Sequence, residues 1–134
     1  MINFDEYRDV FVVADTIDDV VHPVTYELIG QARRIAKELG QLVQVMLLGE
    51  NVQAEAEELV AHGADIVHVF ESPLLKYYTT DGYTKVLTDF FEDHKPNILL
   101  IGATNNGRDL APRMSGRMQN GVVADCTILT VDTE

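Results

Sequence analysis

Residues 98–113 read Ile-Leu-Leu-Ile-Gly-Ala-Thr-Asn-Asn-Gly-Arg-Asp-Leu-Ala-Pro-Arg, and this stretch is the most informative feature of the chain. The short apolar run Ile98–Ile101 predicts a buried parallel strand. The residues from Gly102 onward form a polar turn that leads into an amphipathic segment typical of a helix. In open α/β sheets, ligands and partners bind at the turn that follows the carboxyl end of a parallel strand. This turn is therefore the first candidate for a functional site.

The same turn carries a local excess of positive charge in a chain whose net charge is -12. Residues 102–121 hold three arginines and one acid: Arg108, Arg113, Arg117 and Asp109. Two interpretations stay open. In the first, Gly107 supplies a positive φ, Asp109 caps the helix, and the arginines pair with surface acids. In the second, Arg108 and Asp109 face a partner or a phosphate at the amino end of the helix, where N–H groups and the helix dipole favour an anion.

Composition predicts a single domain over residues 1–134, without a membrane-inserted segment. The 22 acidic residues against 10 basic ones argue against nucleic-acid binding and against anionic membranes, because both need clustered positive charge. Cys126 is the one cysteine, so no internal disulfide forms, and no cysteine–histidine spacing indicates a metal site. The acidic amino terminus lacks the apolar core of a signal peptide. We therefore expect a cytoplasmic location.

Apolar runs alternate with helical patterns along the whole chain. Strands are expected at 10–14, 42–48, 66–70, 98–103 and, interrupted by the polar Asp125, within 122–129. This alternation predicts an α/β fold: a doubly wound, mostly parallel, five-stranded Rossmann-like sheet of order 3-2-1-4-5, with helices on both faces. In that order the topological switch lies between the first and fourth strands. Ala14–Thr16 and the Gly102 turn should therefore border one crevice.

Catalytic and nucleotide-binding patterns are not found in the sequence. The residues after the first strand, Ala14–Asp19, contain no glycine, so a pyrophosphate cradle is not expected there, and no Walker-type sequence occurs. A hydrolase centred on Asp15 or Asp125 would need a base or nucleophile, and neither accompanies these residues. The residues alone predict a domain that docks something and is not an enzyme.

Three stretches together resemble one known family. They are 102–113, then Asn-Gly-Val-Val-Ala-Asp-Cys-Thr at 120–127, and Pro-Val-Thr-Tyr-Glu-Leu-Ile-Gly-Gln-Ala-Arg at 23–33. In combination they are similar to the amino-terminal domain of the alpha subunit of electron transfer flavoproteins. The resemblance extends from about Arg8 to Glu134.

The resemblance implies one subunit of a heterodimeric electron carrier that takes electrons from flavin dehydrogenases to a downstream acceptor. It implies a beta subunit as partner, which carries AMP or a second FAD. It places the FAD of the alpha subunit in a separate carboxyl-terminal domain that this chain does not include. No cofactor is then expected in this chain alone.

The resemblance also predicts which residues face the subunit interface or its nucleotide. They are Thr104, Asn105, Asn106, Gly107, Arg108 and Asp109, together with Arg113 and Asp125. An alternative hypothesis is a stand-alone nucleotide-binding domain, similar to stress proteins, that holds AMP or ATP in the switch-point crevice.

Overall fold

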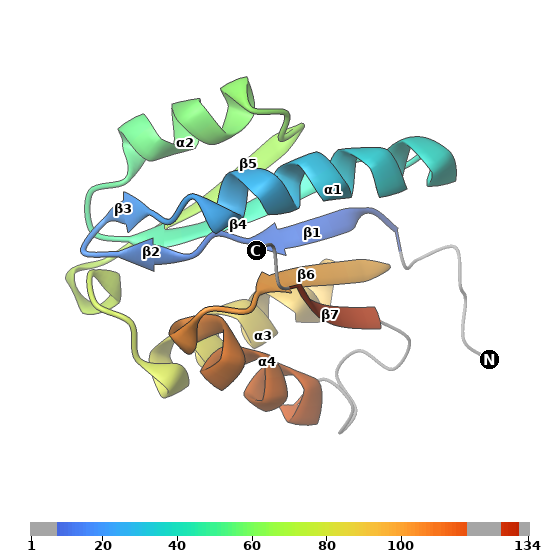
Figure 1. Cartoon of the computed structure of the whole chain (residues 1–134). Coiled ribbons are helices and arrows are strands. Elements are labelled where there is room, and N and C mark those ends of the chain that lie inside the picture. Colours follow the sequence, from blue (N-terminus) through green and yellow to red (C-terminus); the bar gives the residue numbers. More distant parts are fainter. Residues whose placement is uncertain (1–7, 118–126, 132–134) are drawn as a thin grey trace.

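A parallel five-stranded sheet forms the centre of the computed structural model, which describes residues 8–117 and 127–131 (Figure 1). Its strands are β1 (Val10–Val13), β4 (Val43–Gly49), β5 (Ile66–Glu71), β6 (Ile98–Gly102) and β7 (Thr127–Val131). Their order across the sheet is β5-β4-β1-β6-β7, and every neighbouring pair is parallel. The predicted order 3-2-1-4-5 is therefore confirmed. Of the fifth predicted strand, 122–126 lie outside the described residues, while Ile128 and Leu129 belong to β7.

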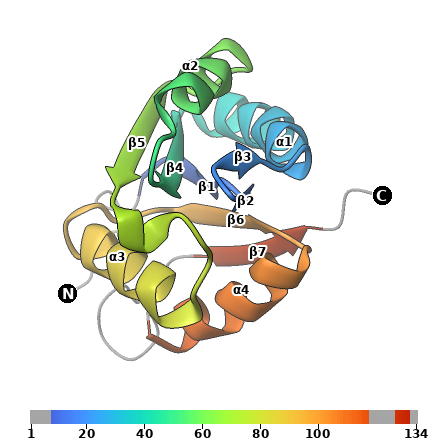
Figure 2. The ribbon, with the colours of Figure 1, turned by 90° about the vertical axis from the view of Figure 1, so that its left-hand side faces the viewer.

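Within the described residues, four α-helices cover the two faces of the sheet, as expected for crossover connections between parallel strands. They are α1 (Val24–Leu39), α2 (Gln53–Ala61), α3 (Thr80–Asp93) and α4 (Asn105–Arg117). Figure 2 shows α1 and α2 on one face and α3 and α4 on the other. The chain leaves β1 toward α1 on the first face and leaves β6 toward α4 on the second. This divergence makes the junction of β1 and β6 the topological switch point.

Each face has its own apolar core. Val12, Leu28 and Leu100 belong to the core under α1 and α2, and all three are almost fully buried. Phe11, Phe91 and Met114 belong to the core under α3 and α4. The alternation of side chains along β1 divides its apolar residues between the two cores, so β1 is buried on both faces.

A small antiparallel hairpin, β2 (Thr16–Ile17) and β3 (Val20–Val21), follows β1 and was not predicted. Its two-residue turn is Asp18-Asp19, with φ of 52° and 65°. Positive φ values at both central residues are those of a type I′ turn, whose twist matches the twist of the two strands of a hairpin. Aspartate adopts a positive φ more readily than most residues. Strands of two residues are too short to produce an alternating pattern, so periodicity could not reveal them.

Candidate functional site

A crevice opens at the carboxyl ends of β1 and β6, where the sequence predicted that residues 14–16 and the Gly102 turn would meet. Two adjoining hollows share Asp15 and Asn106 among their lining residues. One hollow is polar and lies beside the start of α4, and the other is mostly apolar and lies under the segment that precedes α3. The meeting of the two turns is confirmed, because Thr104 Oγ1 donates a hydrogen bond to Asp15 Oδ2.

Two side chains at the start of α1 accept hydrogen bonds from backbone N–H groups beside the polar hollow. Thr25 Oγ1 on α1 accepts a hydrogen bond from the Asp15 N–H at 3.0 Å, which fixes the end of β1. His22 Nδ1 accepts from the Val24 N–H at 3.0 Å at the beginning of α1. In the neutral ring the proton is then on Nε2. Ile17 and Asn105 complete this hollow, so the new hairpin forms one of its walls.

The beginning of α4 corrects the first interpretation of the arginine turn. Thr104, not Asp109, caps the helix, because its Oγ1 accepts from the Gly107 N–H at 3.1 Å. Gly107 does not have a positive φ. It is glycine because a Cβ at this position would stand 1.8 Å from the Gly102 carbonyl oxygen. The turn therefore needs glycine for a close approach between α4 and β6.

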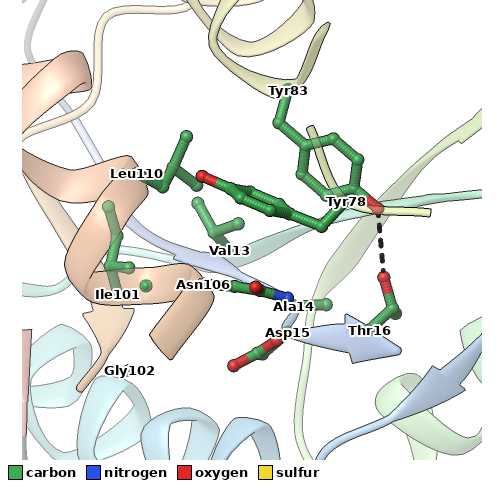
Figure 3. A pocket seen from close by; sticks show the side chains of 11 residues that line it. Val13, Ala14, Asp15, Thr16, Tyr78, Tyr83, Ile101, Gly102, Asn106 and Leu110 are labelled. Carbon is green, nitrogen blue, oxygen red and sulfur yellow. Dashed lines mark hydrogen bonds between the residues drawn. The ribbon is translucent and has the colours of Figure 1, made fainter. Parts of the chain in front are cut away.

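The apolar hollow is a slot between α4 and the strand ends (Figure 3). Val13, Ile101 and Leu110 form part of its lining. Tyr83, only 3% exposed, forms a fixed wall: its hydroxyl donates to the Leu75 carbonyl at 3.0 Å and lies 3.3 Å from Thr16 Oγ1. The Tyr78 ring lies beside Tyr83 with the ring centroids 5.0 Å apart, so a second aromatic ring lines the slot.

Tyr78 is held in place by Asp109. The Tyr78 hydroxyl donates to Asp109 Oδ2 at 2.7 Å, and Thr80 Oγ1 donates to the same oxygen. The two hydrogen bonds, together with the nearby Arg113 charge, lower the pKa of the Asp109 carboxyl. Burial of Tyr78, together with its bond to the Asp109 carboxylate, raises the pKa of its phenol to about 12. Asp109 is therefore an ionised acceptor and Tyr78 a neutral donor at neutral pH.

The raised pKa of Tyr78 predicts a distinct titration. The folded protein favours the neutral phenol, so the stabilisation from this group is complete below pH 10 and is lost as the pH rises through about 12. In an ultraviolet titration of tyrosinate, the difference between wild type and Tyr78→Phe should be a single step near pH 12. Tyr77→Phe, at an exposed neighbouring ring, should leave that step in place. A difference step near pH 10 would contradict the burial of Tyr78 and its bond to Asp109.

The structure separates the sequence-predicted site residues into two groups. Those that line the crevice are Thr104, Asn105, Asn106 and Gly107. Those on the exposed surface of α4 are Arg108, Asp109 and Arg113. Arg113 pairs with Asp81 at the start of α3, which supports the surface-pairing interpretation for that arginine. Asp125 lies outside the described residues.

Exposed apolar side chains at the same edge of the sheet were missed by the sequence analysis. Ile17 and Val20 on the hairpin are 61% and 66% exposed, and Leu74 and Tyr77 are 84% and 64% exposed. Lys76 brings the two segments together, since its Nζ lies 3.8 Å from an Asp18 carboxylate oxygen. We call Ile17, Val20, Leu74 and Tyr77 the apolar rim. Single apolar residues in a sequence do not show whether the fold buries their side chains or leaves them exposed to solvent.

The two hollows of the crevice differ in size, and the polar hollow has a free volume of about 370 Å³. Beneath Tyr78 the free space is about 20 Å³, enough for one or two water molecules but not for an isoalloxazine or adenine ring. Within 8–117 and 127–131, no three histidine, cysteine or acidic side chains are grouped to hold a metal ion. Among the helices in those ranges, none has the length and apolar character that crossing a bilayer requires.

Comparisons of the sequence with known proteins identify the family of the chain. The electron transfer flavoprotein domain model matches residues 10–134. The chain is 45% identical over 129 residues to the electron transfer flavoprotein subunit alpha of Megasphaera elsdenii, covering 96% of this chain and 38% of that protein. It is 47% identical over 123 residues to lactate dehydrogenase (NAD(+),ferredoxin) subunit LctC of Acetobacterium woodii, covering 92% of this chain and 29% of that protein. The chain thus spans about two fifths or less of the length of these relatives.

A solved structure extends the comparison at the level of the fold. A universal stress protein crystallised in complex with cAMP superposes with a TM-score of 0.56 at 15% identity, covering 96% of this chain and 99% of that one. At this identity the likeness concerns the Rossmann-like fold alone. With the family model matching nearly all of its length, the chain belongs to the electron transfer flavoprotein domain family, and its sequence relatives include alpha subunits.

Proposed function

We propose that this chain is the amino-terminal interface module of an electron transfer flavoprotein alpha subunit, without a catalytic site of its own. The observation that carries the proposal is the match over residues 10–134 to the family, together with relatives that are alpha subunits. In this role the chain works with a beta subunit, in the cytoplasm, in a carrier between flavin dehydrogenases and a downstream acceptor. FAD belongs to the complete heterodimer, and AMP or a second FAD to the beta subunit.

Two surfaces of the chain support an interface role. The apolar rim exposes four large apolar side chains beside the crevice, and such a cluster gains free energy when a partner removes it from water. The exposed side of α4 carries Arg108 and Arg113 in a chain that is otherwise strongly acidic. We propose that the rim supplies apolar contact and that Arg108 binds an acidic group of the partner or of its nucleotide.

Co-expression with a beta subunit tests this function. We expect a heterodimer whose dissociation constant rises at least about tenfold in the double variant Ile17→Asp/Val20→Asp, because the introduced charges would have to be desolvated at the interface. Arg108→Glu should weaken binding as well. Val60→Asp is the matched control, because Val60 is 53% exposed on α2, away from the rim.

Measurements on the chain purified alone, and on the variants above, give the outcomes that would contradict the proposal. The purified chain alone should hold no stoichiometric FAD. A yellow complex of the isolated chain, or a chain that reduces dyes unaided, would show that it carries its own redox site. Equal effects of Val60→Asp and of the rim variant would show that the rim is not the interface.

A further inference from the structure

The β2–β3 hairpin exposes two apolar side chains to solvent and buries the other two residues of its strands. Thr16 and Val21, one cross-strand pair, face the fold and are buried. Ile17 and Val20, the second pair, face outward and are largely exposed. Side chains directly opposite each other on one face of a hairpin lie in contact distance. Ile17 and Val20 therefore form one apolar projection, which we call the hairpin knob.

A hairpin of this length needs support from the rest of the fold. It has two strands of two residues each, and even a longer two-stranded hairpin is only marginally stable in water. At its base the His22 N–H donates to the Asp15 carbonyl at 2.7 Å. Thr16 Oγ1 also donates to the Leu48 carbonyl at 3.0 Å. These bonds hold the base of the hairpin, so its turn must be held by other contacts.

Asp19 attaches the turn of the hairpin to the connection between β4 and α2. Its Oδ1 accepts a hydrogen bond from the Glu50 N–H at 2.9 Å, and its Oδ2 accepts from the Asn51 N–H at 3.2 Å. A charged acceptor strengthens both bonds. The ion pairs of Lys76 with Asp18 and Glu50 contribute less, because they are long and exposed. Asp19, with its φ of 65°, thus forms both the turn and its attachment.

Gly49, the last residue of β4, leaves the space that this attachment needs. A Cβ on Gly49 would stand 2.6 Å from Asp19 Oδ1 and 2.5 Å from Val52 Cγ1. A larger residue at position 49 would therefore displace the Asp19 carboxylate or the Val52 side chain. The carboxylate at the turn and the glycine at the strand end belong to different elements, and their close fit fixes where the hairpin lies.

We propose that Asp19 is a positioning residue that holds the hairpin knob in the geometry in which an apolar recess of the beta subunit receives it. This inference rests on the proposed function and adds how the interface is prepared before the partner binds. A knob that is already ordered loses less conformational entropy on binding than a mobile one. A second copy of this chain is a less suitable partner, because two copies of net charge -12 repel each other.

The decisive variant is Asp19→Gly, because glycine adopts the positive φ of the turn freely and only the carboxylate is lost. We expect about a tenth of the molecules to keep the knob in its binding geometry, so the apparent dissociation constant for the beta subunit rises about tenfold. Asp19→Asn keeps an oxygen acceptor and tolerates a positive φ, so it should recover most of the affinity. Surface plasmon resonance with the beta subunit measures the three constants.

Asp65→Ala is the matched control at the opposite end of β4. The Asp65 carboxylate also binds backbone, since its Oδ2 accepts from the Val43 N–H at 2.8 Å, and it pairs with Arg33. Asp65→Ala should lower the free energy of unfolding at least as much as Asp19→Gly does, and should leave the dissociation constant unchanged. A merely structural role of Asp19 would make the two variants alike in both measurements.

A double-mutant cycle tests whether Asp19 acts through the hairpin knob. In the Ile17→Ala/Val20→Ala background the knob is already truncated, so Asp19→Gly should raise the dissociation constant less than about twofold there. An equal effect of Asp19→Gly in both backgrounds would overturn the positioning role, because Asp19 would then act by another route.

Hydrogen exchange of the free chain tests the attachment without the partner. The Glu50 and Asn51 amides lose their acceptor in Asp19→Gly and should exchange faster, and so should the His22 amide at the base of the hairpin. Unchanged exchange at all three amides would overturn the attachment.

The binding outcomes separate this inference from the proposed function. A wild-type chain that forms no complex with the beta subunit would overturn the proposed function and, with it, the partner named here. A complex in which Asp19→Gly binds as tightly as wild type would overturn the positioning role alone. A dimer of this chain that dissociates in Asp19→Gly would overturn the beta subunit as the occupant of the hairpin knob.

Discussion

Gly107→Ala should unfold or severely destabilise this protein. The added Cβ would lie 1.8 Å from the carbonyl oxygen of Gly102 and 3.2 Å from Ile101 Cγ2. The first contact is with backbone of β6, which lies between β1 and β7 and cannot shift without disturbing both pairings. We expect a loss of at least about 3 kcal/mol in the free energy of unfolding, at the upper end of overpacking effects.

The same helix supplies a matched control for this substitution. Gly116 is also in α4, is exposed, and has no atom within 4 Å of the position of an added Cβ. Gly116→Ala should therefore raise stability by up to about 1 kcal/mol through helix propensity alone. Urea denaturation of both variants gives the two free energies. A Gly107→Ala variant as stable as wild type would show that α4 does not approach β6 as closely as described.

Phe91→Ala should cost about 3–5 kcal/mol in the free energy of unfolding, because it leaves a cavity in the core beneath α3. Phe91 has no exposed surface, and its ring meets Phe11 edge-to-face with centroids 5.5 Å apart. It therefore attaches α3 to β1, the central strand of the sheet.

Tyr77→Ala is the control for Phe91→Ala. It also removes an aromatic ring, but from a side chain that is 64% exposed, and should change stability by less than about 0.5 kcal/mol. Thermal or urea unfolding followed by circular dichroism measures both changes. Similar losses for the two variants would mean that burial does not set the cost at these positions.

The sequence was sufficient for the architecture because the signals for it are local. Each strand is a short apolar run and each helix has its own periodicity, so the alternation of the two could be followed along the chain. Crossover handedness then restricted the strand order, and the order β5-β4-β1-β6-β7 agreed with the expectation. The same order brought Asp15 and Thr104, which are 89 residues apart, to one crevice.

The roles of individual residues at the turn could not be obtained in this way. In one of the two interpretations of the sequence, Gly107 has a positive φ and Asp109 caps the helix, and both of these are local explanations. The structure gives tertiary ones: Gly107 admits the close approach of β6, and Asp109 accepts from Tyr78, which is 31 residues away. A sequence pattern contains no information about which side chain of another element will arrive at a given atom.

Local sequence patterns were enough to predict the layered α/β fold, the switch point and the family, because apolar periodicity and motif spacing are properties of neighbouring residues. That Tyr78 lines the apolar slot, and that the exposed side chains of the apolar rim border the crevice, follows from the three-dimensional packing alone. Those features depend on the packing of segments distant in sequence, and the free energy of that packing is not encoded in any one of them.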